Sequence, residues 1–154
     1  MNQGLLLKLE LCSNPGVLCV IRGAVERLTE LFGFSAAECR SVTRAVDEAV
    51  SNVIRHTYCG CLDKPITMYF RRVRRRSKEQ LKVGLEILLL DRGPAIDTTK
   101  LCGRKLDEIR PGGLGLHFIR EAMDTVEFTR LGRMNRLRLV KYLQPSKVDS
   151  DSQK

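Results

Sequence analysis

Three short motifs that follow one another in a fixed order constrain this 154-residue chain more than any other feature of its sequence. The segment Asp47–Asn52 places an acid and an amide one helical turn apart, and Asp91–Gly93 follows the most apolar run of the chain. The third motif, Arg110–Leu116, is a glycine-rich turn that opens a helical pattern. Each motif alone is weak evidence. Together they are typical of a nucleotide site, which needs a helix that holds a metal ion, a carboxylate that reads a base and a loop that surrounds phosphates.

The hydrophobic pattern around these motifs predicts the fold class. Leu81–Leu90 is the most apolar strand candidate, so we expect it at the centre of a sheet. Ser35 and Glu38 form a capping box at the start of the second helix. The order of elements predicts an α+β fold, a two-layer α/β sandwich whose helices cover one face of a mixed, mostly antiparallel sheet. The expected strands are Leu5–Leu11, Ile66–Val73, Leu81–Leu90, Thr125–Leu131 and Leu137–Leu143. The expected helices run from Asn14–Gly16 to Gly33, from Ser35 to about Tyr58 and over Gly113–Met123. The connections include a polar turn at Arg74–Gln80 and a long loop at Pro94–Arg110.

Length and composition fit one domain over residues 1–144, followed by a polar tail over residues 145–154. No apolar stretch is long enough to span a bilayer, and the first residues lack the basic region of a signal peptide. We therefore expect a cytoplasmic protein without membrane contact. The six cysteines lack zinc-like spacing, and we expect them to be reduced residues of the core.

The formal net charge is +9, and much of it lies in the run Arg71–Lys78. This run indicates either attraction to an acidic partner, nucleic acid or protein, or merely a solvated hairpin tip. Aromatic residues make up only 5% of the chain, which argues against a platform for single-stranded nucleic acid, and no helix-turn-helix signature is present. Nucleic acid is therefore not an expected partner.

The first motif fits metal and proton chemistry. Glu48 and Asn52 are four residues apart and share one helix face. Magnesium prefers oxygen ligands, so the amide of Asn52 suits it, while the carboxylate of Glu48 could deprotonate an attacking hydroxyl or water. The alternative is a solvated polar helix face, which is common.

The second and third motifs fit a base and its phosphates. Asp91, at the end of a buried strand, needs a partner such as the exocyclic amine of adenine, and Gly93 would let a flat base approach the backbone. The turn from Gly112 to Gly115 precedes a helix, where backbone amides favour phosphate. The alternatives are an ordinary Asp-x-Gly turn and a loop that needs positive φ. Neither a Walker loop nor a Rossmann fingerprint is present. Lys100, Arg104, Lys105 and Arg110 lie in the preceding loop and could reach phosphates.

The wording and order of these motifs resemble the bacterial anti-sigma factor serine/threonine kinases, which belong to the Bergerat-fold ATPases with a histidine-kinase-like ATP-binding domain. The segments Ala45–Tyr58, Gly112–Ile119, Met123–Asp124 and Asn135–Lys141 carry the resemblance, which extends from about Leu5 to Leu143. It implies a Bergerat ATP-binding fold and bound ATP with Mg²⁺. It also implies that Asn52 is a ligand of the metal and Glu48 the general base for a serine hydroxyl.

The same resemblance assigns further residues and partners. Asp91 would read adenine with Gly93 beside it. The phosphate-binding residues would be Arg110, Gly112, Gly113, Leu114, Gly115 and Leu116, and the loop before them would be the ATP lid. The implied activity is that of an ATP-dependent protein serine kinase in a partner-switching pathway. Its substrate would be an anti-anti-sigma protein, and its other partner a sigma factor held by a kinase homodimer.

Three features depart from the family pattern. Ala95 stands where family members often carry a glycine, Asn135–Arg136 where some have a threonine that supports the adenine pocket, and the basic run Arg71–Lys78 has no counterpart. Two other functions remain open. One is a non-catalytic ATP-binding module that sequesters a regulatory partner, and the other is a basic nucleic-acid-binding domain, which rests on charge alone.

Overall fold

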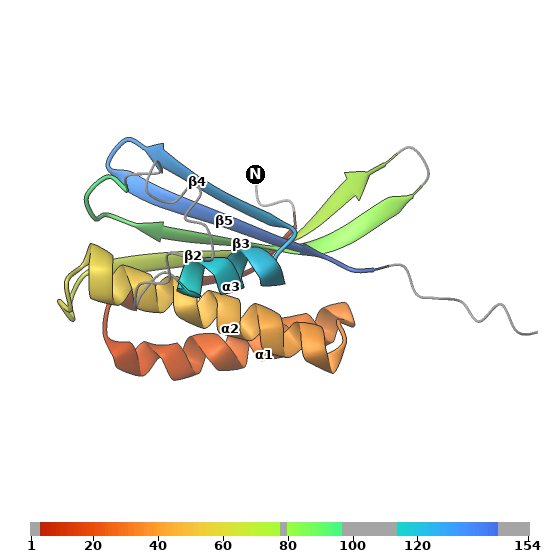
Figure 1. The fold of residues 1–154 in the computed structure, drawn as a ribbon, viewed down its shortest axis with the longest axis horizontal. Helices are drawn as coiled ribbons and strands as arrows, with labels where there is room; N and C mark the ends of the chain where they lie inside the picture. Colours follow the sequence, from red (N-terminus) through yellow and green to blue (C-terminus); the bar gives the residue numbers. More distant parts are fainter. Residues whose placement is uncertain (1–3, 78–79, 97–113, 145–154) are drawn as a thin grey trace, which may run out of the picture.

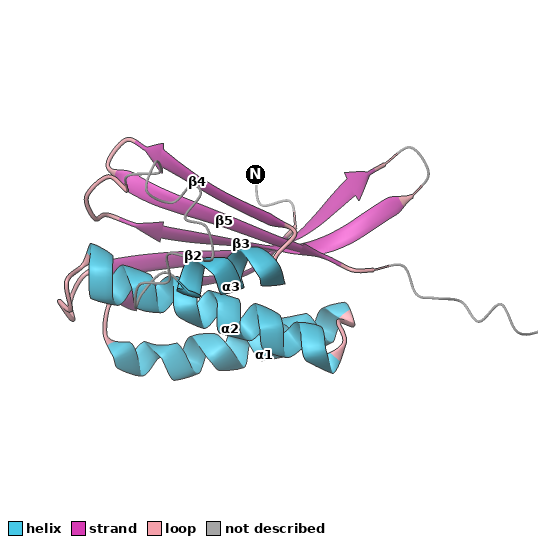
Figure 2. Cartoon of the chain, in the orientation of Figure 1, coloured by secondary structure: helices cyan, strands magenta, loops and turns pink. Residues whose placement is uncertain are grey.

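A computed structural model of the chain describes residues 4–77, 80–96 and 114–144. Within these ranges, five strands form one sheet, and three α-helices cover one of its faces (Figures 1 and 2). This arrangement confirms the predicted α+β, two-layer fold. The strands are β1 (Leu5–Cys12), β2 (Pro65–Arg76), β3 (Leu81–Asp91), β4 (Thr125–Leu131) and β5 (Met134–Tyr142), and the α-helices are α1 (Leu18–Phe32), α2 (Ala36–Asn52) and α3 (Leu114–Ala122).

The sheet has the order β1-β2-β3-β5-β4, so the apolar strand β3 lies at its centre as predicted. Every neighbouring pair among the described strands is antiparallel, where the sequence predicted a mixed, mostly antiparallel sheet. The register pairs Asp91 at the end of β3 with Asn135 near the start of β5. These two residues, far apart in the sequence, are thereby neighbours on adjacent strands.

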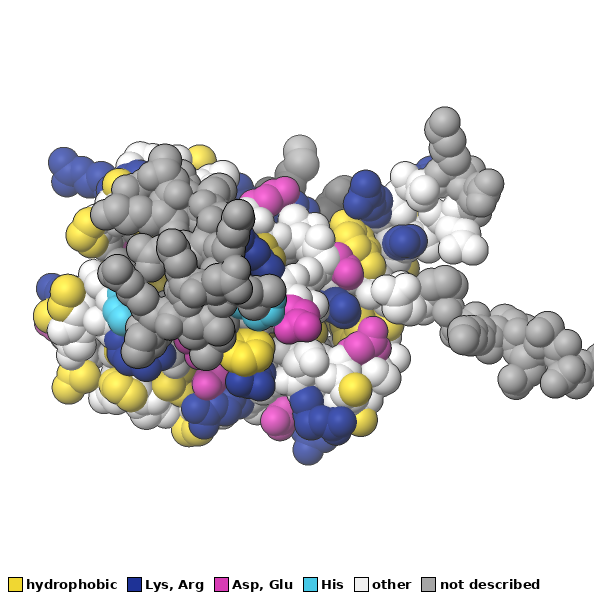
Figure 3. All heavy atoms as spheres, in the orientation of Figure 1, with side chains coloured by type: hydrophobic (Ala, Val, Ile, Leu, Met, Phe, Trp, Pro, Cys, Tyr) yellow, Lys and Arg dark blue, Asp and Glu magenta, His cyan; other side chains and the backbone are white. Residues whose placement is uncertain are grey.

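Strand β2 is longer than the alternation of its sequence indicates. The polar turn predicted over Arg74–Gln80 is wrong for its first three residues, because Arg74–Arg76 continue the ladder with Leu81–Val83 of β3. Backbone hydrogen bonds extend this pairing although neither face is buried there. The outer end of the hairpin reaches beyond the rest of the sheet in Figure 1, and Lys and Arg side chains are visible along it in Figure 3.

Helices α1 and α2 form an antiparallel pair whose ends match the sequence signals. Gly33 ends α1 in the left-handed conformation with φ 85°, which a glycine adopts without steric cost. Ser35 accepts a hydrogen bond from the Glu38 amide, and the Glu38 carboxylate accepts one from the Ser35 amide. A 3₁₀ turn, η1 (Pro15–Val17), precedes α1 and begins at the cap Asn14.

The core lies between this helical layer and the sheet. The face of β3 toward the helices carries Leu85, Ile87 and Leu89, which join one buried cluster with Val46 and Val50 of α2. Burial of each such side chain stabilises the fold by roughly 1.5–3 kcal/mol relative to exposure. Of the described cysteines only Cys39 belongs to the core. The expectation of buried thiols is wrong for Cys12, Cys19, Cys59 and Cys61, which are exposed.

The end of α2 is wider than an ordinary helical turn. Val53–Thr57 form a π-helical turn, η2, in which the Tyr58 amide donates to the Val53 carbonyl. Such turns are frequent at functional sites because they change where the following side chains point. The Tyr58 hydroxyl then donates to the Pro65 carbonyl at 2.6 Å and accepts from the Arg92 amide at 2.7 Å. These bonds tie the end of α2 to the ends of β2 and β3.

None of the helices in the described ranges is both long and apolar enough to cross a membrane. The predicted tail over residues 145–154 and most of the predicted loop Pro94–Arg110 lie outside the described residues.

Candidate functional site

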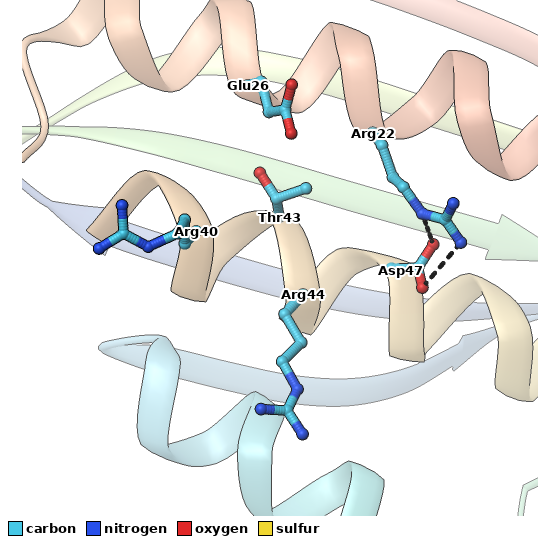
Figure 4. Close-up of a pocket in the computed structure, with 6 residues that line it drawn as sticks. All are labelled: Arg22, Glu26, Arg40, Thr43, Arg44 and Asp47. Atoms are coloured by element: carbon cyan, nitrogen blue, oxygen red, sulfur yellow. Dashed lines mark hydrogen bonds and ion pairs between the residues drawn. The ribbon is translucent and has the colours of Figure 1, made fainter. Parts of the chain in front are cut away.

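Asp47 and Glu48, the two acids at the start of the first motif, have different surroundings. Asp47 faces α1, where its carboxylate accepts hydrogen bonds from Arg22 Nε at 2.7 Å and Nη2 at 3.3 Å (Figure 4). This paired geometry ties α1 to α2. Glu48 is half-buried, and Arg55 Nη2 lies 3.7 Å from its Oε1. Of the two, Glu48 is therefore the acid that remains for chemistry.

The amino-terminal turn of α3 lies directly on Glu48. A methyl group on Gly115 would lie 2.2 Å from Glu48 Oε1 and 2.7 Å from its Cδ and Cγ, far inside van der Waals contact. Gly115 is buried, and α3 begins one residue before it. A helix amino terminus carries partial positive charge, so the position favours the carboxylate and other anions nearby. The structure thus brings together two predicted site residues, Glu48 and Gly115, that are 67 positions apart (115 − 48 = 67) in the sequence.

Asp91 is almost wholly buried and is held by two donors. Its Oδ1 accepts from the Gly93 amide and from Asn135 Nδ2, both at 2.8 Å. Asp91 is 4% exposed and Asn135 is 2% exposed, so both residues are buried. Among the hydrogen bonds of the described residues, none uses Asp91 Oδ2. The carboxylate is therefore oriented through Oδ1, while Oδ2 accepts no hydrogen bond from the residues that the structure describes.

Asn135 is the centre of this arrangement, whereas the sequence analysis noted it as part of a resembling strand and as a departure from the family pattern, and not as a site residue. Its Nδ2 also donates to the Pro94 carbonyl at 2.8 Å, and its Oδ1 accepts from Arg130 Nη1 at 2.7 Å. A single amide thus links Asp91 of β3, Arg130 of β4 and the backbone after β3. Asn135 occupies an inward-facing position of the alternating strand β5. Its burial could not be predicted from the sequence of β5 alone, because a polar residue is not expected at such a position.

Thr57 is a second residue that the sequence did not single out. A methyl group on Gly93 would lie 1.9 Å from Thr57 Cγ2 and 3.1 Å from Asp91 Oδ1. The Thr57 side chain therefore occupies the space that a side chain at position 93 would need. Thr57 belongs to the π-helical turn η2, which begins one residue after Asn52. The end of α2 and the Asp91 turn are thereby in direct contact.

The predicted phosphate-binding residues are described only in part. Leu114 begins α3, Gly115 is buried and Leu116 is half-buried, while Arg110, Gly112 and Gly113 lie outside the described residues. The same holds for the loop cations Lys100, Arg104 and Lys105. Asn52 is half-buried at the end of α2, one turn beyond Glu48 and on the same face. The structure thus places Gly115 of α3 against Glu48 of α2, and it places Gly93, two residues after Asp91, against Thr57 in the turn that follows Asn52.

A hollow of about 260 Å³ lies elsewhere, between α1 and α2 (Figure 4). Its lining consists of Arg22, Glu26, Arg40, Thr43, Arg44 and Asp47. Arg44 also stacks on the ring of Phe118 of α3 at 3.9 Å, which holds α3 against α2. None of the predicted site residues that the structure describes lines this hollow.

The chain is similar to a known protein family and to several curated proteins. The histidine kinase-like ATPase domain family matches residues 13–141. The serine-protein kinase RsbW of Bacillus pumilus (strain SAFR-032) is 24% identical over 163 aligned positions, covering 99% of this chain and 95% of that protein. The serine/threonine-protein kinase BtrW of Bordetella bronchiseptica is 30% identical over 109 positions, covering 68% of this chain and 71% of that protein.

Two solved structures share the fold. The SiaB–SiaC complex from Pseudomonas aeruginosa contains a chain that matches with a TM-score of 0.58 at 14% identity, covering 92% of both chains. The RsbU and RsbW domains of a Mycobacterium tuberculosis protein match with a TM-score of 0.58 at 13% identity, covering 91% of this chain and 34% of that one. This chain therefore spans about a third of the length of the mycobacterial protein.

Proposed function

Because this chain belongs to the histidine kinase-like ATPase domain family, and within it to the group of the RsbW serine-protein kinases, we propose that it is an ATP-dependent protein serine kinase. Its substrate would be a serine of an anti-anti-sigma protein, and its second partner would be a sigma factor. The kinase would act in the cytoplasm and bind the sigma factor as a kinase homodimer. The serine-protein kinases named among its relatives support this activity.

The observation that carries the proposal is the contact between Glu48 and the first turn of α3. Gly115 lets the amino terminus of this helix approach the Glu48 carboxylate closely. A general base and a phosphate-binding helix end must lie side by side if a hydroxyl is to attack a phosphoryl group. This junction combines the two.

The base of the nucleotide would bind at Asp91. Adenine presents an exocyclic amine, which is a hydrogen-bond donor, and Asp91 Oδ2 is an acceptor without a protein partner among the described residues. The two bonds to Oδ1 from Gly93 and Asn135 orient the carboxyl for this role. A buried carboxylate with one oxygen that accepts no hydrogen bond from the described residues fits recognition of adenine better than a purely structural turn.

A magnesium ion would bind at Asn52. Within the described ranges, no three side chains of His, Cys, Asp or Glu lie together as a metal-binding group. The amide oxygen of Asn52 would thus be the protein's contribution, with phosphate oxygens and water completing the shell. Mg²⁺ is commonly held in this way in ATP-dependent enzymes.

The chain's own residues would then act on the serine. ATP with its metal supplies the phosphoryl group and neutralises its charge. The Glu48 carboxylate accepts the proton of the serine hydroxyl while the serine oxygen bonds to the γ-phosphorus and the bond to the leaving ADP oxygen breaks. Arg55, which lies 3.7 Å from Glu48 Oε1, would help to hold the carboxylate in place. Positioning and electrostatics supply most of the rate in such transfers.

The test separates binding from chemistry with two variants. Calorimetry should show ATP binding that requires magnesium and weakens in Asn52→Ala, because the metal loses its protein ligand. Glu48→Gln should keep ATP binding and lose phosphoryl transfer to the anti-anti-sigma partner by about 10²–10⁴-fold, the usual contribution of a general base. Equal loss of binding and transfer in Glu48→Gln would exclude the base assignment. Tight ATP binding without transfer in the wild type would favour a non-catalytic binding module.

A further inference from the structure

The outer part of the β2–β3 hairpin is a two-stranded arm. Pairing between β1 and β2 ends at Arg71, and pairing between β3 and β5 begins at Gly84. Beyond these points, residues 74–76 and 81–83 pair in the sheet only with each other. We call this segment the basic arm. In Figure 1 it projects away from both the helices and the rest of the sheet.

The root of the basic arm is fixed to the body of the domain. The Arg72 amide donates to the Gly4 carbonyl at 2.7 Å, and the Leu143 amide donates to the Val83 carbonyl at 2.9 Å. The Arg72 guanidinium also lies over the ring of Phe32, 4.6 Å from its centre. The arm thus has a defined direction, because the residue before β1, the residue after β5 and helix α1 all contact its base.

Cations occupy both faces of this ribbon. Side chains alternate along a strand, so Arg74 and Arg76 lie on one face and Arg75 on the other. Arg75 pairs directly across the ladder with Lys82. All four side chains are exposed, and none of them forms an ion pair with any residue that the structure describes. The sequence from Arg72 to Lys82 holds six basic residues and a single acid, Glu79.

This charge pattern works against the isolated hairpin. Like charges that face each other across a ladder destabilise it. The Arg75–Lys82 pair has that arrangement, without a described acid to offset it. The pattern is therefore better explained by an external anion than by the stability of the fold.

The two-sided distribution favours one kind of anion. A folded acidic protein surface would meet one face of the ribbon and leave the other face unpaired. A groove with phosphates on both walls would meet both faces. The major groove of B-form DNA is about 12 Å wide and admits a two-stranded ribbon, whereas that of A-form RNA is too narrow for side chains to enter. The arm has no aromatic residue for stacking on single strands.

We propose that the basic arm binds duplex DNA by entering the major groove, with Arg74 and Arg76 toward one phosphate wall and Arg75 and Lys82 toward the other. Contacts to phosphate position a protein without reading sequence, so the binding should be independent of sequence. The sequence argued against nucleic acid from two missing signatures, a recognition helix and an aromatic platform. A basic ribbon is a third mode that neither signature tests. The proposal does not depend on the nucleotide site.

The experiment is fluorescence anisotropy of the full chain with a labelled DNA duplex of about 20 base pairs, at salt concentrations from about 50 to 200 mM. For four phosphate contacts, the slope of log affinity against log salt should be about −3.6, at roughly −0.9 per contact. In the variant Arg74→Gln/Arg75→Gln/Arg76→Gln the slope should become shallower by about 2.7, and affinity at the lowest salt should fall about tenfold or more. Lys82→Gln alone should change the slope by about 0.9.

The matched control is Arg27→Gln/Arg40→Gln/Arg133→Gln, which removes the same charge from exposed arginines outside the arm. The proposal is overturned if this control loses as much DNA binding as the arm variant, or if an RNA duplex binds as tightly as DNA. It is also overturned if the wild type does not bind DNA but binds poly-L-glutamate, and the arm variant loses that binding. This result would indicate an acidic protein partner. ATP binding, measured in parallel, should be unchanged in the arm variant, so failure of the kinase proposal would be seen separately.

Discussion

Gly115 lies so close to Glu48 that a single added methyl group would come within 2.2 Å of the carboxylate oxygen Oε1. The glycine therefore sets the distance between α3 and α2 at the point where the proposed base meets the proposed phosphate-binding helix end. Under the proposed function, the rate of transfer should therefore be sensitive to a small change at a residue that carries no functional group.

Gly115→Ala should lower phosphoryl transfer by about tenfold or more, because the methyl group must push Glu48 or α3 out of position. Radiolabelled ATP and the partner protein provide the assay, and thermal unfolding shows whether the fold survives. Gly23→Ala is the matched control, since a methyl group on Gly23 of α1 would meet nothing within 4 Å. That control should keep full activity and gain about 0.5–1 kcal/mol of stability. Equal activity of the two variants would show that the close contact of Gly115 with Glu48 is not needed for phosphoryl transfer.

Asn135→Ala should destabilise the fold by about 1–3 kcal/mol, because the buried Asp91 carboxyl loses one of its two donors and the Pro94 carbonyl loses the donor from Asn135. It should also weaken ATP binding, since the Asp91 carboxyl loses one of the two donors that orient it. Asn135→Thr keeps a hydroxyl donor and should restore part of both losses. The measurements are urea unfolding and calorimetry with ATP. Unchanged ATP affinity in Asn135→Ala would show that Asn135 supports the fold alone.

Gly93→Ala should destabilise the protein by about 1–3 kcal/mol through overpacking, because the new methyl group would overlap Thr57 Cγ2. Thr57→Ser removes that methyl group and should recover much of the loss in the double variant. A double-mutant cycle of unfolding free energies measures the coupling, which we expect to be about 0.5–3 kcal/mol. Additive effects would mean that the two residues do not limit each other's packing.

Tyr58→Phe should lower the free energy of unfolding by about 1–3 kcal/mol near neutral pH, because the Arg92 amide and the Pro65 carbonyl lose their shared partner. Burial raises the pKa of the Tyr58 phenol above its ordinary value, with the neighbouring Asp91 charge acting in the same direction. A group whose pKa is raised on folding stabilises the protein below its unfolded pKa, about 10, and loses that contribution as pH rises through the folded value.

The stability difference between wild type and Tyr58→Phe should therefore shrink as pH rises above about 10. Urea unfolding of both proteins at neutral and alkaline pH makes the comparison, and groups common to both cancel in the difference. A difference that stays constant across this range would show that the phenol does not titrate in the way its burial requires.

Much of the fold could be predicted because its signals are local. The Ser35–Glu38 capping box, the left-handed Gly33 and the apolar run of β3 each act through residues that are neighbours in sequence. The extension of β2 through Arg74–Arg76 could not be predicted in this way, since those residues are held by backbone pairing with β3 and bury no apolar face.

The same division holds for the candidate site. The sequence by itself determined which residue types are present and in what order, so Glu48, Asn52, Asp91 and Gly115 could be named from spacing and motif. Only the tertiary structure decided that Asn135 and Thr57 belong beside them. An amide or a methyl group acquires such a role from the atoms it meets, and those atoms come from strands and helices distant in the sequence. The antiparallel register of β3 with β5 and the wide turn after α2 supply that proximity.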